Sequence, residues 1–101
     1  MDQQPITVIV AKDLEDLIPT FITNRTKELA TLRVALGAGD MEQLRQLGHR
    51  MKGVGNSYGF EHISVLGKQI EDDAKIKNLS GLEAIITDYM DYLARVKIVA
   101  E

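Results

Sequence analysis

Apolar residues recur every three or four positions over most of the chain, which is the period of an amphipathic helix. The pattern predicts four helices, at about residues 19–36, 40–58, 60–75 and 81–99. The connections between them are short, and short connections place successive helices antiparallel to one another. The chain is therefore predicted to be all-α, an antiparallel up-down four-helix bundle.

Residues typical of helix ends mark several of these boundaries. Asp40 with Gln43 forms a capping-box pattern at the start of the second helix, and Ser80 with Glu83 forms another at the start of the fourth. A pair of glycines shortly after residue 36 ends the first helix. The residues of the second helix that are expected to face the core are Leu44, Leu47, Met51, Val54 and Tyr58.

The first twelve residues do not follow the helical period. Ile6–Val10 is rich in β-branched residues, as strands are, but the sequence contains no second strand-like segment to pair with it. Because an unpaired strand leaves its backbone groups unsatisfied, residues 1–12 are expected to form an extended arm on the helical body or the start of a helix. A short extra helical turn from Asp13 to Leu17 is expected to follow the arm, with Asp13 as its cap.

Composition and charge exclude several classes of protein to which the chain could otherwise belong. A chain of 101 residues is long enough for one hydrophobic core, so a single domain over residues 1–101 is expected. The net charge of −3 argues against a nucleic-acid-binding protein, and the absence of cysteine excludes disulfides and thiolate metal sites. No apolar run is long enough to cross a membrane. We expect no membrane association and a cytoplasmic location.

The stretch Leu44–Phe60 contains the most informative chemistry. On a helix, His49 lies almost opposite the aliphatic row of this segment and is expected to face water. Gly53 lies one turn beyond His49 on the same face, so no side chain covers that flank of the imidazole. Gly48 and Gly55 lie at the sides of the helix, where they allow close contact with a neighbouring helix. Each glycine costs about 1 kcal/mol of helix stability relative to alanine, so the cluster requires a reason.

The residues beside His49 favour an anion on its ring. An exposed, neutral imidazole has a nucleophilic nitrogen, and Lys52 lies one turn away on the same face. Together these features suit temporary carriage of a phosphoryl group. The sequence has no Gly-rich phosphate loop, no acidic metal pair and no kinase motif. We therefore expect a phosphocarrier without autonomous kinase activity and without a cofactor of its own, whose partner supplies the phosphoryl donor and Mg²⁺.

The run from His49 to Gly53 (HRMKG), with Gly59 closing the segment, resembles the signature of histidine-containing phosphotransfer (HPt) domains. Leu44–Gly48 and Ile63–Glu71 agree with the same family, and Asp13–Arg25 resembles the opening helix of stand-alone bacterial members. The similarity extends over nearly the whole chain.

The resemblance implies a four-helix bundle in a two-component phosphorelay. His49 would accept a phosphoryl group from a receiver-domain aspartate, on the ring nitrogen farther from the backbone, and pass it to another. Lys52 would steady the phosphoryl group and Gly53 would leave room for the receiver. The implied partners are response-regulator receiver domains or a hybrid sensor kinase, met by a monomer. The implied docking surface comprises Arg45, Gln46, Arg50 and Asn56, with Lys68, Glu71 and Lys75 on the next helix.

One departure from the family concerns Glu71. Some members place a glutamine on the neighbouring helix beside the histidine, where this chain has Glu71, and this leaves open whether a side chain holds the imidazole tautomer. By residue pattern alone, the acidic run 71–73 is most simply a solvated helical face, with Lys68 and Lys75 on the same flank.

Other interpretations of the same residues remain. A lone exposed histidine is usually only solvated, and His49 with His62 matches no common metal-ligand spacing. The competing function is a non-catalytic interaction module that binds a receiver without carrying phosphate. A third interpretation is a part of a larger sensor kinase, although the methionine start and the helix boundaries favour a stand-alone chain.

Overall fold

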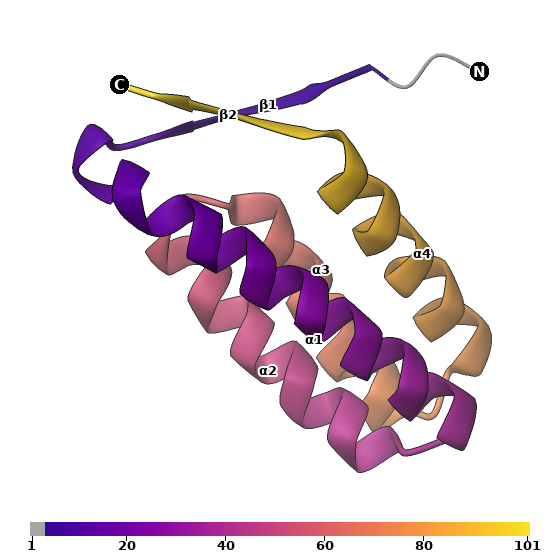
Figure 1. Cartoon of the computed structure of the whole chain (residues 1–101). Helices are drawn as coiled ribbons and strands as arrows, with labels where there is room; N and C mark the ends of the chain where they lie inside the picture. The colour runs from indigo at the N-terminus through magenta and orange to yellow at the C-terminus, as the bar shows by residue number, and fades with distance from the viewer. Residues whose placement is uncertain (1–3) are drawn as a thin grey trace.

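Four α-helices make up most of the molecule in the computed structural model, which describes residues 4–101 (Figure 1). They are α1 (Ile18–Ala38), α2 (Met41–Ser57), α3 (Glu61–Lys75) and α4 (Leu79–Arg95). Turns at residues 39–40, 58–60 and 76–78 join them, so successive helices run antiparallel. The prediction of an all-α, up-down four-helix bundle is confirmed.

The capping residues of the helices agree only in part with those predicted from the sequence. The side chain of Asp40 caps α2 by accepting a hydrogen bond from the backbone N–H of Gln43 at 3.1 Å, as expected. The expected cap of α4 was wrong, because Asn78 takes that place and its side chain accepts from the N–H of Gly81 at 3.2 Å. Ser80 lies inside the helix and donates its hydroxyl to the Asn78 side chain. Two capping residues two positions apart compete for the same helix start, and sequence spacing alone does not rank them.

The core lies between the apolar faces of the helices. Leu44, Leu47 and Met51 of α2 are buried, and Val54 and Tyr58 are partly buried against them, as the helical period predicted. The fully buried side chains come from all four helices and the turn before α3; the largest are Tyr89, Phe60, Leu32, Leu44, Met51, Ile63, Leu66, Ile70 and Leu82. One continuous core therefore fixes which face of each helix points to solvent.

A two-stranded parallel sheet lies across one end of the bundle (Figure 1). In it, β1 (Ile6–Val10) pairs with β2 (Val96–Ala100), with Ile6 opposite Val96. Two expectations were wrong here, since the arm has a partner strand and the last helix ends at Arg95 instead of near residue 99. The β-branched residues of 96–100 fit either a helix or a strand, and pairing with β1 makes the strand more favourable.

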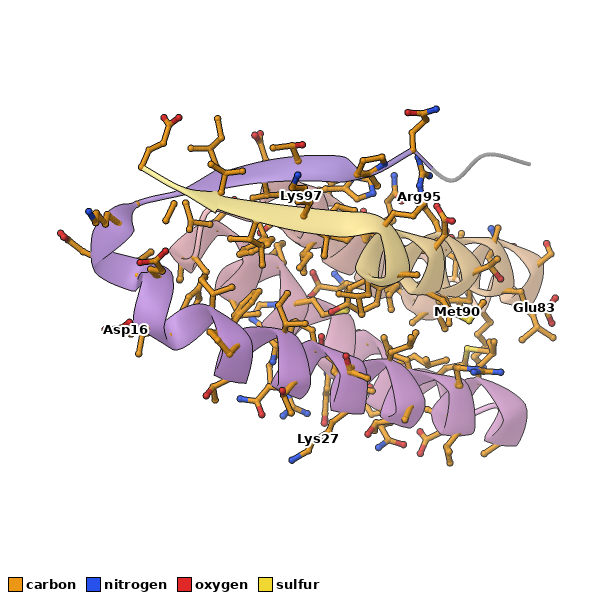
Figure 2. All side chains as sticks on the ribbon, turned by 45° about the horizontal axis from the view of Figure 1, so that its top comes forward. Asp16, Lys27, Glu83, Met90, Arg95 and Lys97 are labelled. Carbon is orange, nitrogen blue, oxygen red and sulfur yellow. The ribbon has the colours of Figure 1, made fainter. Side chains whose placement is uncertain are left out.

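The sheet is tied to the rest of the chain at both ends. Figure 2 shows Arg95 at the junction of α4 with β2 and Lys97 on β2. The Arg95 side chain donates to the carbonyl oxygen of Gln4 at 2.7 Å.

After β1, the expected short turn forms a 3₁₀ helix over Lys12–Leu17, but its cap is Ala11 and not Asp13. Residues 1–3 of the expected arm lie outside the described residues. Among the described helices, none combines the length and apolarity that a membrane crossing needs.

Candidate functional site

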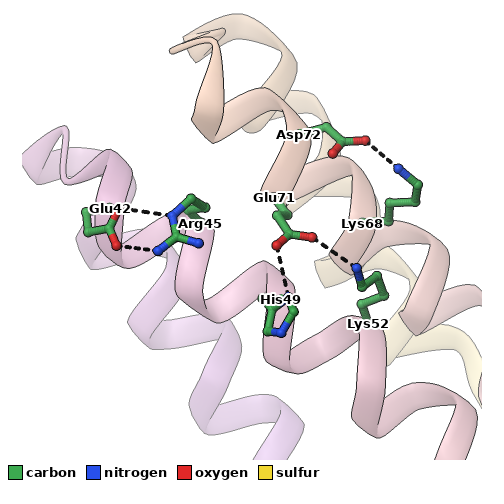
Figure 3. Close-up of polar contacts among 7 residues, drawn as sticks. All are labelled: Glu42, Arg45, His49, Lys52, Lys68, Glu71 and Asp72. Carbon is green, nitrogen blue, oxygen red and sulfur yellow. Dashed lines mark hydrogen bonds and ion pairs between the residues drawn. The ribbon is translucent and has the colours of Figure 1, made fainter.

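His49 lies on the face of α2 that points away from the core, and its side chain is 64% exposed. The expectation from the helical period, an imidazole facing water, therefore agrees with the structure. Its Nδ1 atom lies 2.9 Å from Oε2 of Glu71, on α3 (Figure 3). The ring is thus exposed on one side and held on the other.

Glu71 is the main correction to the expected site. It was expected on the outer flank of its helix, as part of a solvated acidic face and of the docking surface, yet its side chain is only 8% exposed. It points toward α2, where Oε2 contacts His49 and Oε1 contacts Nζ of Lys52 at 3.3 Å (Figure 3). Both carboxylate oxygens therefore have partners, which answers the question that the sequence left open about the imidazole tautomer.

Small residues on both helices bring α2 and α3 close enough for these contacts. A Cβ atom on Gly48 would lie 2.7 Å from the carbonyl oxygen of Gly67, and one on Gly67 would lie 2.6 Å from the backbone nitrogen of Lys52. Farther along, a Cβ on Gly55 would lie 2.7 Å from the backbone nitrogen of Ser64. Close helix contact at Gly48 and Gly55 is confirmed.

The α3 side of this contact was missed by the sequence analysis. Ser64 donates its hydroxyl to the carbonyl oxygen of Lys52 at 2.7 Å, and both Ser64 and Gly67 are buried. The signal was present, because Ser64, Gly67 and Glu71 are spaced three and four residues apart and so share one face of α3. Small residues at that spacing mark a face on which another helix packs closely.

The charge of Glu71 decides which group donates the hydrogen bond between Glu71 and His49. Burial raises the pKa of the Glu71 carboxyl, because it disfavours the charged form. Hydrogen bonds from Lys52 and His49, and to a smaller extent the charge of Lys75, lower this pKa. The lowering effects outweigh that of burial, so the pKa of Glu71 lies below its usual range. An ionised carboxylate only accepts hydrogen bonds. Nδ1 of His49 is therefore the donor, and in the neutral ring Nε2 carries the lone pair.

The model of the Hpt domain family matches residues 16–97 of this chain. The chain belongs to the Hpt domain family. Hpt domains have a histidine phosphotransfer role in the phosphorelays of two-component signalling, and they interact with response-regulator receiver domains and kinases. Comparison with curated proteins and with solved structures found no match.

Within this Hpt domain, the flank of His49 toward Gly53 is open. A Cβ atom on Gly53 would have no heavy atom of the described residues within 4 Å beyond its own helix turn. A shallow groove lies beside it, lined by Lys52, Asn56, Glu61, Ser64, Val65 and Lys68. No side chain of the described residues therefore fills the space over Gly53, one turn beyond His49.

The other residues of the expected docking surface are at the surface of the Hpt domain. Arg45 is half-exposed and pairs with Glu42 (Figure 3). Glu42 also accepts a hydrogen bond from the side chain of Gln46. Lys68 pairs with Asp72 at 2.8 Å, and among the described residues no hydrogen bond or ion pair joins either of them to His49. Arg50, Asn56 and Lys75 are exposed. The surface around His49 is therefore rich in cationic side chains.

His62 lies in a different environment from His49. Its ring packs against Tyr92 of α4 with 4.8 Å between the ring centroids, and Nε2 lies 3.8 Å from Asp88. Within residues 4–101, no group of three histidine, aspartate or glutamate side chains is arranged to hold a metal ion. The chain's second histidine therefore faces α4.

Proposed function

We propose that His49 is the phosphorylated residue of this Hpt domain, accepting the phosphoryl group from a receiver-domain aspartate and passing it to another. The observation that carries this proposal is the 2.9 Å contact between Nδ1 of the exposed ring and the ionised Glu71. That contact supports Nε2, the nitrogen farther from the backbone, as the nucleophile.

In the accepting step, the Nε2 lone pair attacks the phosphorus of the aspartyl phosphate. The P–O bond to the aspartate breaks and its electron pair leaves with the receiver carboxylate. The reverse step transfers the group to a second aspartate. Mg²⁺ belongs to the receiver, where it offsets charge on the phosphoryl oxygens.

Lys52 and Gly53 assist this exchange. Lys52 lies one turn from His49 and its side chain is 42% exposed, so its ammonium group can reach a phosphoryl group on the ring. Gly53 leaves the space that a receiver needs to approach Nε2. The docking surface consists of exposed or half-exposed residues around the ring, met by a monomer. Its members are Arg45, Gln46, Arg50, Asn56, Lys68 and Lys75.

Replacement of the histidines tests the proposal. The wild-type protein, His49→Ala and the matched control His62→Ala are each incubated with a receiver charged by radiolabelled acetyl phosphate. Wild type and His62→Ala should acquire acid-labile label, whereas His49→Ala should acquire none and keep the helical circular dichroism of the wild type. Label retained on His49→Ala would refute the assignment. Binding of the charged receiver without label on any of the proteins would support the non-catalytic receiver-binding module instead.

A further inference from the structure

The outer edge of β1 has no partner strand among the described residues. The carbonyl oxygen of Val10 accepts from the backbone N–H of Glu101 at 3.0 Å, so Val10 turns its backbone groups toward β2. Backbone groups of successive residues in a strand point to opposite sides, and this sheet has two strands. The N–H and C=O groups of Thr7 and Ile9 therefore point away from β2, and no backbone hydrogen bond of the described residues satisfies them. They form the free edge of β1.

A groove borders this free edge at the turn between α2 and α3. It has a volume of about 460 Å³ and lies between residues 6–9 of β1 and residues 59–62, with Tyr92 of α4 also in its lining. A Cβ atom on Gly59 would lie 4.0 Å from the carbonyl oxygen of Ile9. The unpaired carbonyl group of Ile9 thus faces the turn, so the groove runs beside backbone groups that an added strand could pair with.

The charges in this groove favour a cationic partner. Among the residues that the structure describes, its lining has one carboxylate, Glu61, and neither lysine nor arginine. Glu61 is exposed. The histidine of the lining, His62, lies beside a second carboxylate, that of Asp88 on α4. The rest of the lining is mostly apolar, so the groove suits apolar side chains with a lysine or arginine close by.

The groove is continuous with the surface around His49. Glu61 belongs to its lining and also to that of the shallow groove beside Gly53, which contains Lys52. A protein that docks at His49 therefore has the free edge of β1 within reach of a segment that flanks its folded domain.

We propose that the free edge of β1 binds an extended segment of a partner protein, which adds a third strand to the sheet and places a lysine or arginine beside Glu61. The backbone groups of Thr7 and Ile9 supply the hydrogen bonds, and the groove takes apolar side chains of the added strand. Charged residues or proline commonly protect edge strands from such pairing, and the sequence of β1, ITVIV, contains neither. The inference goes beyond the proposed function, because this binding involves no phosphoryl group and a segment outside the receiver domain.

The test titrates the ¹⁵N-labelled full chain with the peptide KVTVTVK, blocked at both ends, and follows the backbone amides by NMR. The amide signals of Thr7 and Ile9 should shift to saturation, and their hydrogen exchange should slow, because an added strand accepts hydrogen bonds from both. The matched control is KVPPTVK, which has the same charge but whose consecutive prolines prevent pairing along either edge. Equal binding of the two peptides, or no saturable shift at Thr7 and Ile9, would overturn the inference.

A proline at position 9 tests the edge itself. Ile9→Pro removes an N–H that points away from β2, and its ring stands in the way of an added strand. The affinity for KVTVTVK should fall at least about tenfold, as expected for the loss of one or two hydrogen bonds. Ala100→Pro is the matched control, because its N–H also points away from the partner strand but lies on the outer edge of β2. Its affinity should equal that of the wild type, and an equal loss in both variants would contradict binding at β1.

A second variant covers the case in which Ile9→Pro does not fold. Glu61→Gln leaves both strands intact and removes the carboxylate of the groove, so the affinity for KVTVTVK should fall by about two- to fivefold at low salt, as for an exposed ion pair. Glu83→Gln, on α4 and outside this groove, should bind like the wild type. Equal affinities of Glu61→Gln and wild type would overturn the chemistry assigned to the partner.

Sedimentation of the wild-type chain without peptide distinguishes a partner protein from a second copy of this chain. A monomer whose Thr7 and Ile9 amides exchange rapidly is expected. A dimer that Ile9→Pro dissociates would show that β1 of a second copy occupies the edge, and would overturn the assignment to a partner. None of these measurements uses a phosphoryl group, so their outcome is independent of labelling at His49.

Discussion

Gly48, Gly53 and Gly55 lie on one helix, yet their surroundings give them different roles. A Cβ atom on Gly48 or Gly55 would collide with the backbone of α3, whereas one on Gly53 would meet open space. The first two glycines therefore set the distance between α2 and α3, on which the contact between His49 and Glu71 depends. Gly53 is free of such a packing role, which is consistent with its proposed role in leaving a partner access to the ring.

A pair of alanine substitutions separates these roles. Gly53→Ala should raise the free energy of unfolding by up to about 1 kcal/mol, because alanine favours the helix and finds room there. Gly48→Ala should lower it by about 1–3 kcal/mol, because the new methyl group meets backbone atoms that cannot move aside. Urea unfolding followed by circular dichroism measures both. Equal effects of the two substitutions would show that the helices can separate at little cost.

At the level of the elements, a buried polar contact joins α1 to α4. The hydroxyl of Tyr89, which is fully buried, donates to Oε1 of Glu28 at 3.0 Å, and Arg25 lies 3.4 Å from the same oxygen. Burial raises the pKa of Glu28, although Arg25 and Tyr89 act against this rise. The folded protein therefore holds the Glu28 proton to a higher pH than the unfolded chain does, and this carboxyl lowers stability as the pH rises through that interval.

Removal of the Tyr89 hydroxyl should weaken the packing of α4 against α1. Tyr89→Phe should lower the free energy of unfolding by about 1–3 kcal/mol at neutral pH, because Glu28 loses a hydrogen bond in a buried place. The loss should shrink as the pH falls and Glu28 becomes protonated. Denaturant unfolding at pH 7.5 and pH 4.5 checks this. The control is Tyr92→Phe, on the same helix, whose hydroxyl makes no bond to a carboxylate among the described residues. A loss independent of pH would contradict the assigned partner.

At the level of the whole molecule, the parallel sheet joins the two ends of the described chain. Parallel strands need a long connection, and here the entire bundle lies between β1 and β2. Most of the sheet lies outside the Hpt family match of residues 16–97. The site is built from α2 and α3, so the sheet is an addition to the bundle that contributes no residue to the contacts of His49.

Removal of β2 tests whether the site around His49 is independent of the sheet. A chain ending at Arg95 loses the partner of β1 and exposes Val10, which is 2% exposed in the full chain. Its thermal midpoint should therefore fall, while its helical circular dichroism and its labelling at His49 should remain. Lys97→Ala, which keeps the strand, serves as the control and should melt like the wild type. Loss of labelling in a truncated chain that is still folded would show that the sheet supports the site.

The sequence alone determined the four helices, the Asp40 cap and the exposed face that carries His49. These features depend on the helical period and on hydrogen bonds within a few residues, and both can be obtained from local sequence. The tertiary structure decided the burial of Glu71, because a residue at the edge of a polar face is buried or exposed according to where the next helix crosses. Gly48 and Gly67, on different helices, set that crossing together. It also decided that 96–100 is a strand, since the hydrogen bonds that stabilise it come from β1, far away in the sequence.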